Sequence, residues 1–123
     1  MKLHQDSAGA LNTVTAYGTG WIEINRNRHE GAILLAPEGD VRGWAPADFQ
    51  SLAPEHFEAV LEMGAEIVLL GTGESQRFPH PRLVAALAAA RVGVEAMSTP
   101  AACRTYNILI GEGRRVVAAL LPA

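Results

Sequence analysis

The chain has 123 residues, of which 49% are hydrophobic, and its 10 basic and 13 acidic residues give a formal net charge of -3. This length and hydrophobic content predict one globular domain, 1–123, and exclude a disordered chain. The slight acidic excess argues against nucleic acid as the main partner. No apolar stretch approaches the roughly 20 residues that cross a bilayer, so we expect no membrane insertion.

Two further features bear on where the protein works. The single cysteine, Cys103, cannot form an intrachain disulfide, which fits a reducing compartment. The first residues lack the apolar run of a signal peptide and the arginine-rich pattern of a transit peptide. We therefore expect a cytoplasmic protein, and we expect residues 1–12 to form a flexible N-terminal extension.

The N-terminal third has the composition of β-strands. Residues 13–17 and 21–25 are rich in β-branched and aromatic side chains and are separated by a glycine-containing turn, which predicts a hairpin. Residues 25–31 are polar and are predicted to form a turn. Residues 32–36 are apolar and end before Pro37, which predicts a short buried strand.

The apolar spacing changes from Pro54 onward. Phe57, Val60 and Leu61 fall three and four residues apart, the spacing of one helix face. Pro54 suits the first turn of a helix and Gly64 suits the residue just beyond its end. The sequence therefore predicts a helix between these two residues.

The rest of the chain predicts alternating strands and helices. The expected elements are a buried strand at 66–70, a helix at 82–91, a strand at 94–97, a helix at 99–110 and a strand at 115–121. The predicted fold class is α/β: a single domain in which an N-terminal hairpin is followed by a βαβαβ unit, with a mixed β-sheet and helices packed on it.

Polar residues follow two of these strands and define a candidate crevice. In open α/β sheets, ligands favour the carboxyl ends of parallel strands, where glycine turns and helix N-termini offer free N–H groups. Here the ends of two strands carry Gly71, Thr72, Gly73, Ser98 and Thr99. The alternative is a tight turn in which Ser98 or Thr99 caps the following helix.

Cys103 and Asn107 extend the candidate crevice, because residues four apart share one helix face. A cysteine in the first turns of a helix suits a nucleophile or a redox sensor. However, no base can be located near it from the sequence, and Ala101 and Ala102 precede it. A small buried hydrophobic residue is the commoner role for such a cysteine.

Four residues in or beside the connecting segments are candidates for a contact surface: Trp44, Arg77, Phe78 and Arg82. Aromatic and arginine side chains are typical anchors of protein interfaces. Trp44 suits either a plug over the core or an interface anchor. No spacing of His, Cys and carboxylate residues suits a metal, and no cofactor is expected.

Three segments together resemble one known family: residues 20–25 with the later Trp44, residues 67–73, and residues 93–107. The chain is similar to the small single-domain family of unknown function that includes mitochondrial respiratory complex I assembly factor 3. The resemblance implies a compact α/β domain with a mixed sheet, no established enzymatic activity, no known cofactor and a role in assembly. By matching positions, its signature residues are Gly71, Thr72, Gly73, Thr99, Cys103, Thr105 and Asn107.

Two classes of function remain open from the sequence. The first is a non-catalytic binding or assembly domain whose partners are proteins, a homo-oligomer being one form of such a contact. The second is a small-molecule-binding protein or a thiol-dependent enzyme that uses the crevice. The lack of an acid–base constellation favours the first class.

Overall fold

Two β-sheets organise the part of the chain that this computed structural model describes, residues 10–123. Most of the predicted N-terminal extension, residues 1–9, lies outside the described residues. The smaller sheet is antiparallel and has the order β1-β2-β3. The larger sheet has the order β5-β4-β8-β6-β7. The strands are β1 (Val14–Gly18), β2 (Trp21–Ile24), β3 (Asn27–Glu30), β4 (Ile33–Leu35), β5 (Arg42–Gly43), β6 (Ile67–Gly71), β7 (Gly93–Met97) and β8 (Val116–Leu120).

The small sheet corrects the prediction that residues 25–31 form a turn. Asn25 and Arg26 alone reverse the chain, with φ angles of 52° and 71°, and β3 then pairs with β2. The side chains of β3 are mostly exposed, so this strand has no apolar alternation by which to recognise it. A cation–π contact between β3 and β2 stabilises this pairing: the Arg28 guanidinium lies 3.9 Å from the centre of the Trp21 ring.

The large sheet confirms the predicted α/β class. Strands β6, β7 and β8 are parallel, and β4 pairs antiparallel with β8. Strand β8 lies between β4 and β6, which leaves β7 at one edge and the two-residue β5 at the other. The carboxyl ends of the three parallel strands consequently meet at the same end of the sheet.

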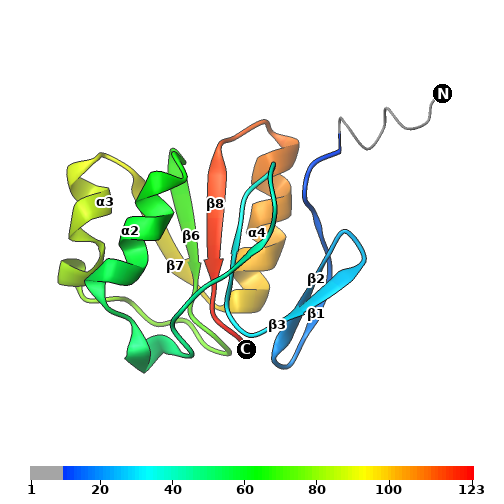
Figure 1. Cartoon of the computed structure of the whole chain (residues 1–123), viewed down its shortest axis with the longest axis horizontal. Coiled ribbons are helices and arrows are strands. Elements are labelled where there is room, and N and C mark those ends of the chain that lie inside the picture. The colour runs from blue at the N-terminus through cyan, green and yellow to red at the C-terminus, as the bar shows by residue number, and fades with distance from the viewer. Residues whose placement is uncertain (1–9) are drawn as a thin grey trace.

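Helices cover both faces of this sheet (Figure 1). Helices α2 (Pro54–Glu62) and α3 (Ala85–Ala89) lie on one face, whereas α4 (Thr99–Gly111) lies on the other, between the large and the small sheet. Two 3₁₀ turns, η1 (Phe49–Ser51) and η2 (Pro81–Val84), complete the elements. The helix predicted at 82–91 is therefore shorter than expected, because η2 takes up its first residues in a tighter turn that begins at a proline.

The central strands supply two hydrophobic cores, because alternate side chains of a strand point to opposite faces. One core joins the small sheet to α4, with Tyr106 fully buried in it. The other lies beneath α2 and α3, with Phe57 fully buried in it. Burial of both faces explains the unbroken apolar run of β6.

Candidate functional site

The candidate crevice residues do meet at the carboxyl end of the large sheet, but they bind one another. The Thr99 hydroxyl donates to the Leu121 carbonyl at 2.6 Å and accepts from the Gly73 N–H at 2.9 Å. The Thr99 N–H donates to the Gly73 carbonyl at 2.8 Å. Thr72 bonds across to β7, its N–H donating to the Met97 carbonyl at 2.8 Å. The three strand ends are thus joined by a buried hydrogen-bond network.

The strand ends pack closely at Gly71. A Cβ atom at Gly71 would lie 2.9 Å from both the Thr99 hydroxyl oxygen and a Leu120 methyl carbon, so this position requires glycine. Ser98 caps α4 by accepting from the Ala101 N–H. The Thr99 and Ala102 N–H groups bond to the Gly73 and Ser98 carbonyls, so the first N–H groups of α4 already have partners.

Cys103 and Asn107 lie away from this network, contrary to the predicted grouping. An α-helix rises about 1.5 Å per residue, so they are one and two turns along α4 from Thr99. Asn107 faces the small sheet: its side-chain oxygen accepts from the Val14 N–H at 3.0 Å, and its amide donates to the Val14 carbonyl at 2.9 Å. Asn107 therefore pairs with β1 as a neighbouring strand would.

The Cys103 side chain belongs to the core between α4 and the small sheet and is 1% exposed. Burial raises the pKa of its thiol to about 12, and the nearby Arg104 guanidinium opposes this only in part. A thiol with such a pKa is protonated near neutral pH and is a poor nucleophile. The geometry fits a packing role.

We predict that Cys103 in the folded protein reacts with a disulfide reagent such as DTNB at least about a hundredfold more slowly than in urea, at about pH 8. The expected slowing follows from both burial and the raised pKa. The control is Cys103→Ala, which should show no labelling. Rapid labelling of the folded protein would contradict a packing role.

The contact-surface prediction needs one correction, at Trp44. Its side chain is only 7% exposed, and its indole N–H donates to the His56 carbonyl at 3.1 Å. Its ring meets that of Phe57 edge-on, with centroids 5.6 Å apart. The Trp44 backbone N–H also donates to the Ala32 carbonyl at 2.9 Å, which holds the residue beside β4 and places its side chain in the core under α2. Trp44 therefore plugs the core and is not an exposed anchor.

The other three contact-surface residues remain exposed around the loop before η2. Phe78 is 78% exposed, the highest value among the large exposed hydrophobic side chains of the described chain. It borders an open, mainly apolar hollow of about 450 Å³ between this loop and β7. Arg77 and Arg82 are exposed on either side, and the Arg77 guanidinium lies 5.5 Å from the centre of the Phe49 ring.

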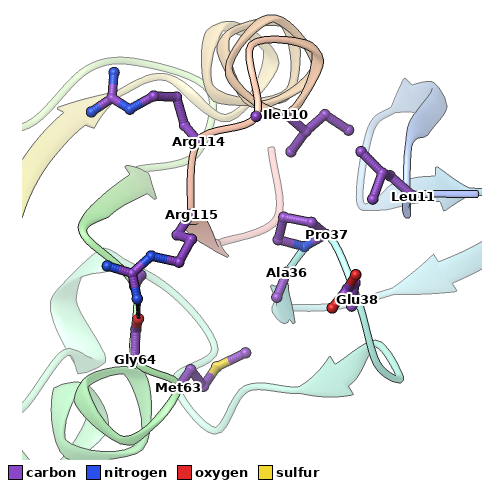
Figure 2. A pocket seen from close by; sticks show the side chains of 11 residues that line it. Leu11, Ala36, Pro37, Glu38, Met63, Gly64, Ile110, Arg114 and Arg115 are labelled. Atoms are coloured by element: carbon purple, nitrogen blue, oxygen red, sulfur yellow. Dashed lines mark hydrogen bonds between the residues drawn. The ribbon is translucent and has the colours of Figure 1, made fainter. Parts of the chain in front are cut away.

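A second hollow, of about 350 Å³, lies near the amino ends of β6 and β8 and was not predicted from the sequence (Figure 2). Its lining comes from separate segments, among them Leu11, Pro37, Met63 and Ile110. Arg115 donates to the Gly64 carbonyl at 3.3 Å, whereas Arg114 points away from the hollow and pairs with Glu66 at 3.4 Å. Both arginines thus serve local contacts. The Arg115 backbone N–H and the Arg114 guanidinium bond to the Glu66 carboxylate and hold its pKa below the usual value.

Residues 10–123 contain neither a metal-binding cluster nor a membrane-spanning helix. No group of three or more His, Cys, Asp or Glu side chains is arranged to hold a metal ion within this range. None of the helices there is long and apolar enough to cross a membrane.

The family model described as "Protein of unknown function (DUF498/DUF598)" matches residues 14–121. The chain belongs to this family. This confirms the family that the sequence resembles, and the match covers every strand and helix described above.

A curated relative from Bos taurus is named "NADH dehydrogenase [ubiquinone] 1 alpha subcomplex assembly factor 3". It is 34% identical over 111 residues, which are 89% of this chain. The chain spans only 60% of that relative's length. The name therefore describes a longer protein than the domain seen here.

Solved structures of bacterial relatives share the fold. A crystal structure from Bordetella parapertussis has a TM-score of 0.88 and 50% sequence identity, covering 93% of this chain and 98% of that one. A solution NMR structure from Bordetella pertussis, described as a Mth938-like domain, has a TM-score of 0.83 and 43% identity, covering 99% and 92%. The two-sheet architecture is thus common to the bacterial relatives.

Proposed function

We propose that this family member is a non-catalytic binding domain that acts by contact with another protein, in the manner of an assembly factor. The observation that carries the proposal is the exposed Phe78 beside an apolar hollow. A phenylalanine side chain that is 78% exposed contributes little hydrophobic burial to folding. It contributes to binding free energy when a partner buries it. The named role of the assembly-factor relatives supports the same class of function.

The alternative, a small-molecule-binding protein or a thiol-dependent enzyme at the strand ends, has less support. Thr99 and the glycine turn direct their polar groups at one another. Cys103 lies a turn away, buried, with a raised pKa. Within the proposal, the protein works in the cytoplasm without a cofactor.

The test compares two exposed hydrophobic residues on different faces. Phe78→Ala should reduce the amount of partner protein captured from an extract of the native cell at least about tenfold, since burying a phenylalanine contributes about 1.5–3 kcal/mol. Ile108, which is 61% exposed on α4, is the matched control, and Ile108→Ala should leave capture unchanged.

Both variants should keep the thermal stability of the original protein, because neither side chain is part of a core. Equal capture by Phe78→Ala and the original protein would contradict this proposal.

A further inference from the structure

Strand β7 has an unpaired edge beside the same hollow. In residues 10–123 it pairs only with β6. The Gly93 N–H donates to the Glu66 carbonyl, and the Met97 carbonyl accepts from the Thr72 N–H, so these two residues direct their backbone groups toward β6. Backbone direction alternates along a strand, and Val94 therefore directs its N–H and C=O to the free side.

Ala96 also faces the free side, and only part of this edge is covered. The Gln76 side chain donates to the Ala96 carbonyl at 2.9 Å. Since β6 is the one strand that pairs with β7 in the described chain, the N–H of Ala96 and the N–H and C=O of Val94, which face away from it, have no strand partner there. Such groups form a template for another extended chain.

The hollow runs alongside this edge and is lined by apolar side chains. Phe78, Pro79 and Pro81 form one side, and Val94 and Ala96 of β7 form the other. Val94 and Ala96 are only half-buried, although both pack against the core under α2 and α3. An extended chain paired with β7 would place alternate side chains in this hollow.

The charges around the edge favour an acidic occupant. Arg77, Arg82 and Arg91 are exposed on the segments that border the hollow. The ion pair formed within residues 10–123 is that of Arg114 with Glu66, so these three arginines have no carboxylate within 4.0 Å there. Glu95 is the one acidic residue in the lining of the hollow.

We propose that β7 binds an extended acidic segment of a partner protein as an added strand, with its apolar side chains beside Phe78 and its carboxylates near Arg77 and Arg82. The proposal rests on the proposed function and names its binding mode. Backbone hydrogen bonds provide the affinity and the hollow selects the alternate side chains. The arginines favour carboxylates over other charges.

The probe is a synthetic nine-residue peptide of alternating glutamate and valine, blocked at both ends. Titrated into the isotopically labelled protein, it should shift the amide signals of Val94 and Ala96 and slow their hydrogen exchange at least about tenfold. Matched peptides with N-methylated valines, or with lysine for glutamate, should lose this effect. No change at either amide at millimolar peptide would overturn the proposal.

A variant at the edge tests the same point in the protein. Val94→Pro removes the outward N–H while leaving the bonds to β6, because that N–H faces away from β6. Val94→Pro should lower the affinity for the glutamate–valine peptide at least about tenfold. The control Val94→Ala keeps the backbone N–H and should bind the peptide with an affinity closer to that of the original protein. The N-methylated peptide gives the same information without altering the protein, should Val94→Pro fail to fold.

The outcomes separate this inference from the proposed function. If Phe78→Ala reduces partner capture while the peptide leaves β7 unchanged, contact through Phe78 stands and strand addition is wrong. If Phe78→Ala leaves partner capture unchanged and the peptide also leaves β7 unchanged, both the proposed function and strand addition are wrong. If sedimentation shows that the protein alone dimerises and Val94→Pro abolishes the dimer, the occupant is a second copy, and the partner segment is wrong.

Discussion

Replacing Thr99 with valine should destabilise the protein by about 2–4 kcal/mol, although the two side chains have almost the same volume. The Thr99 hydroxyl is the one group that bonds both to the Gly73 N–H and to the Leu121 carbonyl, and the residue is 2% exposed. Without the hydroxyl, a buried donor and a buried acceptor both lose their partner. Urea unfolding followed by circular dichroism measures the change.

Thr99→Ser is the matched control, because it keeps the hydroxyl and removes only a methyl group. It should cost about 1 kcal/mol, the usual effect of one buried methyl group. If valine and serine destabilise the protein equally, the hydrogen bonds are not the reason for threonine at this position. A stable Thr99→Val protein would also show that the strand ends tolerate unpaired groups and reopen the crevice as a ligand site.

Asn107→Leu should destabilise the protein by about 2 kcal/mol and loosen the small sheet first. The two bonds of Asn107 to Val14 join α4 to β1, 93 residues earlier in the chain. Leucine has a similar size and can make neither bond. Hydrogen exchange should therefore accelerate in β1 and β2 more than in β6 and β8.

Asn107→Asp separates the two bonds. A carboxylate still accepts from the Val14 N–H but cannot donate to the Val14 carbonyl. The variant should be destabilised near neutral pH and recover relative to the original protein as the pH falls and the carboxyl becomes protonated. Uniform exchange across both sheets in Asn107→Leu would contradict the local role of this residue.

The elements with a strong local pattern could be predicted from the sequence. Phe57 and Val60 define the buried face of α2, and the apolar run of β6 follows from burial on both faces. Strand β3 could not be predicted, because its side chains are mostly exposed and its pairing depends on a two-residue turn with positive φ. Strand β3 forms because it pairs with β2, and its own residues carry no strand pattern.

The residues of the candidate sites also differ in how far the sequence alone predicts their roles. The sequence alone predicts that Gly71 and Thr99, the first residue of α4, meet, because parallel strands end at one edge of a sheet. That the strand-end groups bind one another, and that Trp44 is buried, depends on contacts between distant segments and could be seen only in the folded protein. The tertiary structure also decided that β7 is an edge strand, since strand order depends on where β8 inserts between β4 and β6. Local spacing specifies which residues share a face, whereas pairing between distant segments decides which of those faces remain open to a partner.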